Sequence, residues 1–445
     1  MDILFDLKDP VRFAPMLSLY HFLTRHSAPV LEGLLKRRLA AGKEVPERLD
    51  ERKGQTERTR PEGPLAWVHA ASVGEAQSAL IIIHQLLLRY PALQVLVTTG
   101  TRTSAETMEK SLPARAFHQF YPLDHPEWTH DFLETWTPDV ILWLESELWP
   151  NMLAHIQART IPFILINARL SERSFRRWRI FKPVISSLLK TFSLVLCQSE
   201  QDAKSFKTLG ATEITVTGNL KYAAAPLPAD DPALKALQGA LLGRPCWLYA
   251  STHKGEELLA ARIHQTLKNA LPDLLTIIVP RHPERRDDLR KDLAPSGLNI
   301  IWRSTDKALP DAQTDLYIAD TMGELGLFYR LAPIACIGRT FSDDGGGGHN
   351  PIEAAQLHCA VLHGPQTQNL QDIFSEMDEQ GAALCVQNES DLAQTLHRFL
   401  TTPESLEKQQ ERAKEFTDRK KSVIHTILDK LASILDTIHA LDHAS

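Results

Sequence analysis

Short apolar segments of strand length alternate with segments of helix length along most of the chain after residue 64. Continuous apolar runs, without polar residues at every second position, are typical of strands buried on both faces of a parallel sheet. A first series occupies residues 65–70, 94–99, 139–145, 162–168 and 193–199. A second series occupies residues 246–251, 274–280, 299–304, 315–320, 334–338 and 360–365. The pattern predicts an α/β protein with two consecutive doubly wound, Rossmann-like domains.

The boundaries of these domains follow from where the alternation starts, stops and resumes. A proline-containing segment interrupts it and is expected to be a linker. The predicted order is an N-terminal helical segment, a first Rossmann-like domain, the linker, a second Rossmann-like domain and C-terminal helices, at residues 1–60, 61–222, 223–245, 246–402 and 403–445. In such a pair, ligands are expected in the cleft between the carboxyl ends of the two sheets.

Charge and cysteine content narrow the class of protein. The formal net charge of −6 gives no indication of a nucleic-acid-binding protein. The chain contains no CxxC pair, and its five cysteines are scattered at Cys197, Cys246, Cys336, Cys359 and Cys385. We expect reduced core thiols in a cytoplasmic protein, neither a disulfide framework nor a zinc site.

The N-terminus indicates contact with a membrane surface at most. Asp2, Asp6, Lys8 and Asp9 interrupt any long apolar run, so neither a signal peptide nor a spanning helix is expected. Residues 13–35 fit an amphipathic helix, either in a membrane interface or packed on the domain. The basic run 36–60 fits either a solvated helix face or an anionic membrane surface.

The strongest candidate for chemistry is the segment 338–357, which follows a predicted strand and contains four consecutive glycines, 345–348. Glycines allow the backbone to approach a ligand closely. Asn350 is a suitable N-cap, Pro351 suits the first helical position, and Glu353 falls at the third. Free N–H groups at this helix start would favour a phosphate, and Glu353 could instead reach ribose hydroxyls. The structural alternative is a flexible loop before a capped helix.

Three further turns in the second domain follow predicted strands: STHKGEE (251–257), VPRHPER (279–285) and DTMGEL (320–325). Arg281 would pair with phosphate or carboxylate. Gly323 permits close backbone approach, and Glu324 starts a helix. His282 is not expected to bind a metal, because no second ligand lies at a recognisable spacing. Each turn could be a surface turn, but together they predict a nucleotide pocket.

The first domain offers carboxylates at two strand ends. Ser72 and Glu75 have the spacing of a capping box, and Glu75 could alternatively be a general base. Glu145 and Glu147 would point to one face if the strand continues through them, or they could be acids preceding a helix at Pro150. Lys221 could neutralise a leaving group or simply be exposed.

These motifs, in this order, resemble the lipid A Kdo transferases (3-deoxy-D-manno-octulosonic acid transferases) of Gram-negative bacteria. The resemblance runs from Trp67 to the end of the second domain and rests on eight segments: WVHAASVGEAQSA, LESELWPN, INARLSERS, GNLK, STHKGEE, VPRHPER, DTMGEL and GGHNPIEAA. It implies a GT-B fold and transfer of Kdo from CMP-Kdo to a tetraacyl lipid A precursor (lipid IVA), with inversion and without a metal or other cofactor.

The resemblance also implies roles for single residues. Glu75 matches the family's proton acceptor, and Glu145 and Lys221 match its transition-state stabilisers. The matching CMP-binding residues are Pro280, Arg281, Met322, Gly323, Glu324, Asn350, Pro351, Ile352 and Glu353. The first domain would bind the acceptor and the second the donor. The expected location is the cytoplasmic side of the inner membrane, peripheral or N-terminally anchored, with no nucleic-acid partner.

The chain departs from the family in one place. Gly338-Arg339-Thr340 stands where the family usually has Gly-Gly-Ser/Thr, and the glycine-rich loop is longer. Two other functions stay open at this point. One is a GT-B transferase or epimerase that uses another nucleotide sugar, such as a UDP-sugar. The other is a two-domain binding protein without catalytic activity.

Overall fold

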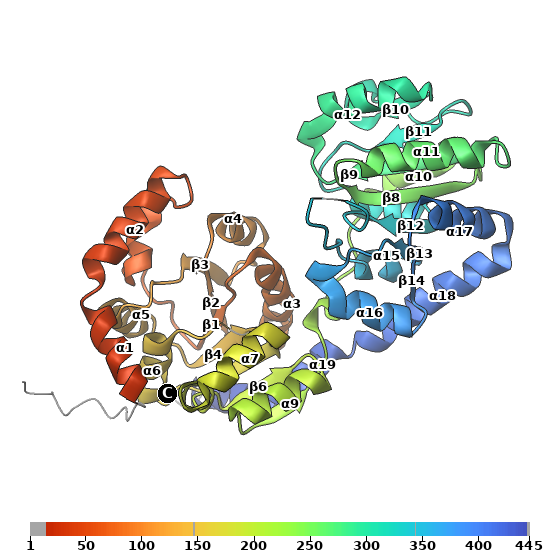
Figure 1. Cartoon of the computed structure of the whole chain (residues 1–445). Helices are drawn as coiled ribbons and strands as arrows, with labels where there is room; N and C mark the ends of the chain where they lie inside the picture. The colour runs from red at the N-terminus through yellow and green to blue at the C-terminus, as the bar shows by residue number, and fades with distance from the viewer. Residues whose placement is uncertain (1–14, 146, 343, 443–445) are drawn as a thin grey trace, which may run out of the picture. The chain divides into compact units, whose positions relative to one another are not determined.

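The computed structural model describes residues 15–145, 147–342 and 344–442. It divides into two compact units, shown in Figure 1. Unit 1 contains the chain up to Ala224 together with the C-terminal segment from Ser422, and unit 2 contains Ala225–Lys421. Each unit contains one parallel seven-stranded sheet, so the prediction of two doubly wound α/β domains is confirmed.

The sheet of unit 1 has the strand order β3-β2-β1-β4-β5-β6-β7. Its strands are β1 (Leu65–His69), β2 (Gln94–Thr99), β3 (Ala116–Phe120), β4 (Val140–Leu144), β5 (Phe163–Ala168), β6 (Leu194–Cys197) and β7 (Ile214–Val216). All five residues of β1 and of β4 are buried. This burial explains why their sequences are continuously apolar rather than alternating.

Helices cover both faces of this sheet. The helical segments of unit 1 are α1 (Pro15–Arg25), α2 (Ala28–Ala40), η1 (Pro46–Lys53), α3 (Val73–Arg89), α4 (Arg102–Ser111), α5 (Pro126–Trp136), α6 (Pro150–Ala158), α7 (Glu172–Ile180), α8 (Lys182–Leu189), α9 (Glu200–Leu209), η2 (Leu220–Ala223) and α19 (Val423–Asp442). Ala66 and Val68 face a core shared with α3 and α19. Leu65 and Trp67 face the opposite core, shared with α5, α6, α8 and α9. Successive residues of β1 thus pack into the cores on opposite faces of the sheet, because side chains alternate along a strand.

The C-terminal region is divided between the two units. Helix α18 (Pro403–Lys420) belongs to unit 2, whereas α19 belongs to unit 1. The apolar face of α19, including Ile427 and Leu431, is buried in the core of unit 1. The side chain of Val423 also lies so close to Gly218 that a Cβ there would come within 2.8 Å of it. The range 403–445, expected as one C-terminal segment, therefore contributes to both domains.

The sheet of unit 2 has the order β10-β11-β9-β8-β12-β13-β14. Its strands are β8 (Cys246–Thr252), β9 (Leu275–Pro280), β10 (Ile300–Trp302), β11 (Leu316–Ile318), β12 (Ile334–Ile337), β13 (Ala360–His363) and β14 (Ala383–Cys385). Its other helices are α10 (Asp231–Leu241), α11 (Glu256–Lys268), η3 (Pro283–Arg285), α12 (Arg286–Leu293), η4 (Ala294–Ser296), α13 (Arg303–Asp306), α14 (Leu325–Leu331), α15 (Ile352–Gln356), η5 (Gln368–Leu370), α16 (Gln371–Glu379) and α17 (Glu389–Thr401).

Part of the segment expected as a linker is ordered as helix α10. Asp230 caps this helix by accepting a hydrogen bond from the Ala233 N–H, and Pro232 lies in its first turn. Leu237 and Leu241 are buried, and α10 packs against α14 within unit 2. The prolines therefore mark a helix start here as well as a connection.

The sequence pattern missed three strands, β3, β7 and β14. Each lies at an edge of its sheet. All three residues of β7 are only partly buried, and β14 ends in an exposed residue. An edge strand is less enclosed than a central one, so it does not need a continuous apolar run.

Two helices, α1 and α2, occupy the region where one helix was expected over residues 13–35. Residues 13 and 14 lie outside the described residues, and the first helix ends at Arg25. Pro29 stands in the first turn of α2, where its missing N–H is tolerated. Helix α1 packs against α5 and α6. Among the described residues, no helix combines the length and the apolar character needed to span a bilayer.

Candidate functional site

In unit 1, Glu75 lies in the first turn of α3, directly after the carboxyl end of β1. Its carboxylate accepts hydrogen bonds from the Ala71 N–H (2.8 Å) and from the Ser72 hydroxyl (2.9 Å). Ser72 Oγ in turn accepts a hydrogen bond from the Glu75 N–H (3.3 Å). Ser72 therefore caps α3 as predicted, but the Glu75 carboxylate bonds the N–H of Ala71, one residue before the position that a capping box uses, and these bonds fix the carboxylate.

The environment of Glu75 favours the protonated form. Only 8% of the residue is exposed, and this burial is the main cause that raises the pKa of Glu75 to about 7. The negative charges of Glu145 and Glu147 raise it further, whereas the two hydrogen bonds to the carboxylate lower it. A carboxyl group with a pKa near neutrality is suited to accept a proton during a reaction. The capping role and the role of a base are therefore compatible in this residue.

Glu145 and Glu147 occupy a turn rather than a strand. Strand β4 ends at Leu144, and Glu145 has a left-handed backbone with φ of 61°. The strand does not continue through Glu145 and Glu147, so their side chains do not share a strand face. Ser146 lies outside the described residues. Helix α6 begins at Pro150, as the alternative interpretation of the segment required.

Tryptophan side chains hold Glu147 in this turn. The indole N–H of Trp143 donates to its carbonyl oxygen (2.6 Å), and the indole N–H of Trp149 donates to its carboxylate (3.1 Å). Burial raises the pKa of Glu147. The charge of Glu147 in turn acts on Glu75, so the two carboxylates form one electrostatic group.

A buried histidine that sequence reasoning did not single out, His69, lies close to Trp143 and Glu147. His69 is the last residue of β1, and its Nδ1 is 2.8 Å from the Thr98 hydroxyl. Its Nε2 has no hydrogen-bond partner among the described residues and lies 4.0 Å from a carboxylate oxygen of Glu147. Burial lowers the pKa of His69 to about 3, so the ring is neutral.

Lys221 lies on η2, a short turn that packs against α3, the helix carrying Glu75. Asn219 caps this turn by accepting a hydrogen bond from the Lys221 N–H (3.0 Å). Asn167, at the end of β5, accepts one from the Leu220 N–H (2.9 Å). The backbone of Lys221 is therefore held from two sides, while its half-buried side chain extends from a fixed point.

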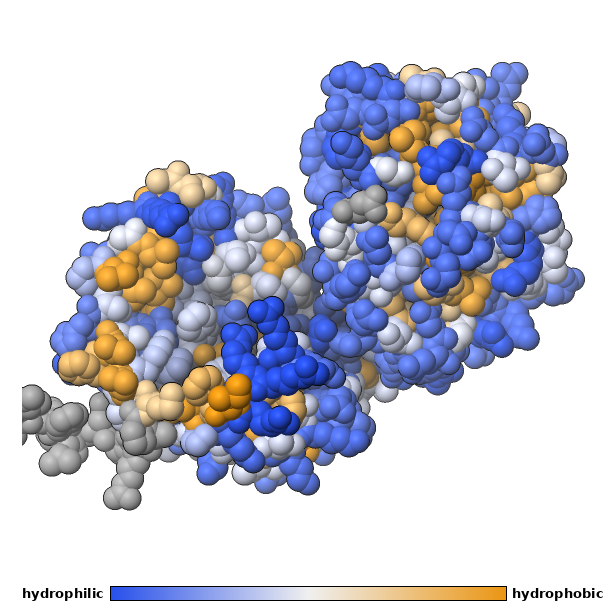
Figure 2. Space-filling view, viewed as in Figure 1, coloured by the Kyte–Doolittle hydropathy of each residue, from blue (hydrophilic) through white to orange (hydrophobic). Residues whose placement is uncertain are grey.

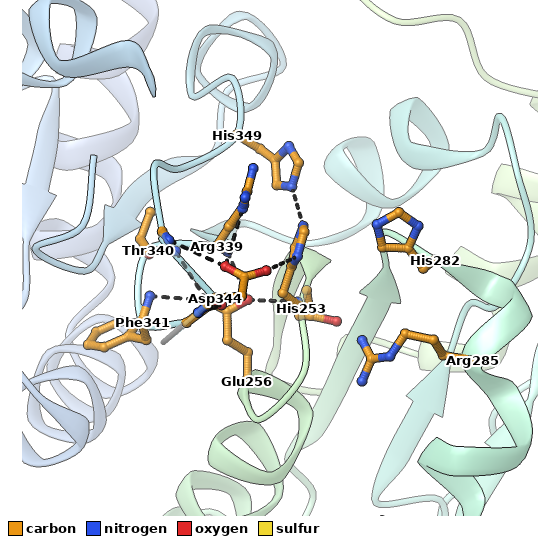
Figure 3. A network of polar contacts seen from close by, with 12 residues as sticks. His253, Glu256, His282, Arg285, Arg339, Thr340, Phe341, Asp344 and His349 are labelled. Carbon is orange, nitrogen blue, oxygen red and sulfur yellow. Dashed lines mark hydrogen bonds and ion pairs between the residues drawn. The ribbon is translucent and has the colours of Figure 1, made fainter. Parts of the chain in front are cut away.

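In unit 2, the carboxylate of Glu256 organises the turn after β12 (Figure 3). One oxygen accepts hydrogen bonds from the backbone N–H groups of Thr340 and Phe341, both at 3.1 Å. The other accepts from the N–H groups of His253 and Arg339, both at 2.8 Å. Glu256 is only 1% exposed. One buried carboxylate thus joins the turn after β8 to the turn after β12.

Three histidines line the same end of the sheet. His253 Nδ1 lies 3.0 Å from a carboxylate oxygen of Asp344, and its Nε2 lies 2.9 Å from Nε2 of His349 (Figure 3). The ring of His282 meets the ring of His253 edge-on, with centroids 5.4 Å apart. Burial lowers the pKa of His349 to about 4, and nearby cations lower it further. A neutral His349 imidazole can both donate and accept hydrogen bonds.

The start of α15 differs in detail from the expectation. The helix begins at Ile352, so Pro351 is the N-cap residue, one position later than predicted. The Asn350 side chain accepts a hydrogen bond from the Ile352 N–H (3.1 Å) and donates one to Glu353 (3.1 Å). Burial raises the pKa of Glu353. Helix α15 has only five residues, so its dipole contributes less to anion binding than a long helix would.

The other predicted donor-binding residues lie at neighbouring strand ends. Pro280 ends β9, and the exposed Arg281 follows it, with its backbone N–H bonded to the Thr252 carbonyl (3.0 Å). Met322 is 69% exposed, and Gly323 has the positive φ of 83° that favours glycine. These residues follow β9 and β11, which are paired in the sheet.

Glu324 already has a partner within the protein. The Arg303 guanidinium donates two hydrogen bonds to its carboxylate, at 2.5 and 2.7 Å, and the Thr321 hydroxyl donates another. These contacts, with the Arg303 hydrogen bond as the largest cause, lower the pKa of Glu324. A ligand at this turn would meet the Glu324 backbone or compete with Arg303 for its side chain.

The chain is similar over most of its length to known transferases. The 3-deoxy-D-manno-octulosonic acid transferase of Rickettsia bellii (strain RML369-C) is 34% identical over 415 residues, which cover 93% of this chain and 98% of the relative. The chain belongs to the 3-deoxy-D-manno-octulosonic acid transferase family. It is therefore a glycosyltransferase.

Two further comparisons agree with this membership. The Kdo transferase of Haemophilus influenzae (strain ATCC 51907 / DSM 11121 / KW20 / Rd) is 33% identical over 377 residues, covering 83% of this chain and 87% of the relative. Residues 47–224 match the sequence profile of a family described as 3-deoxy-D-manno-octulosonic-acid transferase (kdotransferase). The resemblance inferred from the ordered motifs is thus confirmed.

A solved structure supports the fold class. A glycosyltransferase from Rickettsia africae ESF-5 matches with a TM-score of 0.56 at 14% identity, covering 84% of this chain and 99% of that chain. At this identity the likeness shows the fold alone. Together with the two parallel sheets, it confirms the GT-B class expected for a Kdo transferase.

Sequence reasoning on this Kdo transferase family member missed three buried residues, His69, His253 and Glu256. A signal was present for all three, because His253 and Glu256 belong to the selected STHKGEE segment and His69 belongs to the selected WVHAASVGEAQSA segment. The contacts of Glu256 with residues 339–341 span more than 80 positions, so no local pattern indicates them. His69 is the last residue of the apolar strand β1, directly before the turn that the sequence analysis selected.

Proposed function

We propose that this protein transfers Kdo from CMP-Kdo to a tetraacyl lipid A precursor (lipid IVA), with inversion at the anomeric carbon. The observation that carries the proposal is the buried Glu75 carboxylate, fixed at a strand end and with its pKa raised to about 7, in a Kdo transferase family member. Unit 1 would supply the base and bind the acceptor, and unit 2 would bind the donor.

In this reaction the acceptor hydroxyl oxygen attacks the anomeric carbon of Kdo as the bond from that carbon to the CMP phosphate oxygen breaks. Glu75 accepts the hydroxyl proton, because the hydroxyl pKa is too high for it to ionise unaided. The electron pair of the broken bond leaves with CMP, so negative charge develops on the phosphate. Glu145 and Lys221 are assigned to stabilising the transition state, with Lys221 compensating that charge.

The proposed donor site combines one cation with several neutral donors. Arg281 follows β9 and is exposed, so its guanidinium is available to the phosphate or to the carboxylate of Kdo. His349 and Asn350 precede α15, and Glu353 is assigned to the ribose hydroxyls. Pro280, Met322, Gly323, Glu324, Pro351 and Ile352 complete the assigned CMP contacts.

We further propose that unit 1 associates with the cytoplasmic face of the inner membrane. Helices α1 and α2 carry exposed apolar side chains, at Met16, Leu19, Phe22, Leu23, Val30 and Leu34. Figure 2 shows this apolar surface together with a strongly hydrophilic cluster over α7 on the same visible face of unit 1. Helix α7 contains no buried residue and carries exposed Arg173, Arg176, Arg177 and Arg179. Apolar side chains beside basic ones suit an anionic lipid surface. The segment 1–14, expected to take part, lies outside the described residues.

The proposal is tested by incubating the purified protein with lipid IVA and freshly generated CMP-Kdo and measuring product masses. We expect products heavier than the acceptor by whole Kdo units. In a parallel measurement, CMP should raise the melting temperature and UDP should not, because a bound ligand stabilises the folded state by RT ln(1 + [L]/Kd). Stabilisation by UDP alone, with no Kdo-containing product, would favour the alternative donor.

A further inference from the structure

Three side chains with metal-binding atoms meet at the edge of the second sheet. They are His363 at the end of β13, Asp378 on α16 and Cys385 at the end of β14, and their ligand atoms all lie within 4.8 Å of one another. Strands β13 and β14 are paired so that His363 and Cys385 are direct partners. Direct partners point to the same face of a sheet, so the backbone itself brings these two side chains together.

The orientation of His363 is already fixed by the protein. Its Nδ1 lies 2.8 Å from the carbonyl oxygen of Gly364, which can only accept, so Nδ1 carries a proton. Its Nε2 lies 2.9 Å from Asp378 Oδ1. A metal-binding histidine typically has one ring nitrogen tied to a carbonyl in this way, while the other faces the metal. Only 1% of His363 is exposed, so the ring has little freedom to turn.

Cys385 is the exception among the cysteines. The other four are buried, whereas Cys385 is exposed, so the expectation of core thiols is wrong for this residue. Its sulfur accepts a hydrogen bond from the Gln387 side-chain amide (3.3 Å). The thiol is therefore accessible from solvent while it stands beside an imidazole and a carboxylate.

We propose that His363 Nε2, a carboxylate oxygen of Asp378 and Cys385 Sγ bind one divalent transition-metal ion of the zinc type. Nitrogen, oxygen and sulfur ligands together suit Zn²⁺, and three protein ligands leave a fourth, tetrahedral position for water. Binding releases two protons to solvent, the thiol proton of Cys385 and the proton that His363 Nε2 and Asp378 share in their hydrogen bond, so the thiolate, the imidazole nitrogen and the carboxylate are all free to bind the ion. The simpler alternative is a hydrogen-bonded His363–Asp378 pair with an incidental cysteine.

The site is connected to the glycine-rich loop. Gly364, which follows His363, donates its backbone N–H to the Thr340 hydroxyl (2.8 Å). Phe374, one helical turn before Asp378 on α16, contacts the His363 ring and stands 2.7 Å from where a Cβ of Gly348 would be. A bound ion would hold α16 against the sheet and so steady the loop. Any effect on CMP affinity rests on the proposed function, but the binding of the ion does not.

The test uses metal-stripped full-length protein titrated with Zn²⁺ and, separately, with Co²⁺. We expect one equivalent of Zn²⁺ per chain, a rise in melting temperature, and a near-ultraviolet thiolate-to-cobalt absorption band. Cys385→Ser should remove the band, and Cys385→Ser and Asp378→Asn should each weaken Zn²⁺ binding by about tenfold or more. His397→Gln, on the exposed face of α17, is the control and should bind like the unaltered protein.

Absence of stoichiometric binding would overturn the metal site in favour of the hydrogen-bonded pair, as would a cobalt band that persists in Cys385→Ser. Asp378 is partly exposed and Cys385 is exposed, so both variants are expected to fold and the test stays decisive. Neither readout involves CMP or transfer activity. A failure of the metal site is therefore distinguishable from a failure of the proposed function.

Discussion

Ser72 and Glu75 bind each other reciprocally at the start of α3. The Ser72 hydroxyl donates to the Glu75 carboxylate, and the Glu75 N–H donates back to the Ser72 oxygen. The same carboxylate is buried beside two other acids, which is unfavourable for a charge. The start of α3 thus holds a carboxyl group in a place that favours its protonated form.

Replacing Glu75 by Gln should separate these two roles. The amide oxygen can still accept a hydrogen bond from Ala71, so we expect the start of α3 and the fold to be retained. Without a proton acceptor, transfer should fall by about 10²–10⁴-fold, the usual contribution of a general base. Kdo transfer is measured by product mass and CMP binding by calorimetry. Ser72→Ala is the matched control, because it weakens the helix cap but keeps the carboxylate. Full activity in Glu75→Gln would contradict the assignment of Glu75 as the base.

The pH dependence of transfer should follow the protonation of Glu75. A base works only when it is deprotonated, so kcat/KM should rise with pH through an apparent pKa of about 7 and level off above it. In Ser72→Ala the carboxylate loses a hydrogen bond that lowers its pKa, so the rise of kcat/KM should move to higher pH. If the rise of kcat/KM occurs at the same pH in Ser72→Ala, the group that titrates is not Glu75.

The contribution of Glu75 to the free energy of unfolding should fall with rising pH, whereas the transfer activity should rise. The pKa of Glu75 is raised from 4.5 in a free side chain to about 7 in the folded protein. Between these values the folded state holds a proton that the unfolded state has released, so the free energy of unfolding decreases as pH rises. Urea unfolding from pH 4.5 to pH 7 should show a shallower decrease in Glu75→Gln, which has no proton to lose at this position.

Glu256 should be essential for the architecture of the turn after β12. In Glu256→Ala, four backbone N–H groups lose their acceptor, and leaving buried donors unsatisfied costs about 1–3 kcal/mol each. We expect a loss of at least about 2 kcal/mol in the free energy of unfolding, together with weaker CMP binding. Chemical denaturation and calorimetry measure the two effects. Lys254→Ala, an exposed change in the neighbouring turn, should alter neither.

Arg281 should contribute to donor affinity without contributing to the fold. Its side chain is exposed, so Arg281→Ala should leave the melting temperature unchanged. Loss of a hydrogen bond to a charged group, worth about 1.5–3 kcal/mol, should weaken CMP binding by about 10- to 100-fold. Lys291→Ala removes a similar exposed charge on α12 and serves as the control. Equal effects of both changes would indicate a general electrostatic field rather than a contact.

Membrane association should depend on the apolar surface of α1. Phe22 and Leu23 are each 59% exposed, so replacing both by Ser costs little stability while removing apolar area that could enter a bilayer. We expect weaker sedimentation with vesicles containing anionic lipid. Leu88→Ser, at a side chain that is 75% exposed on α3, is the control and should sediment normally. Equal loss in both variants would argue against a specific surface.

The sequence by itself determined the central strands of both sheets, because buried parallel strands require continuous apolar runs that are visible locally. It also indicated the family, because eight motifs of that family can be read in order along the chain. The contact between Ser72 and Glu75 was equally predictable, because the two residues are only three positions apart. Tertiary structure alone decided the three edge strands β3, β7 and β14, the position of α19 in unit 1, and the environment that raises the pKa of Glu75. It alone brought Glu256 to the turn at 339–341 and His363 to Cys385. These features depend on burial and on contacts between distant residues, and both arise only when strands pair and helices pack.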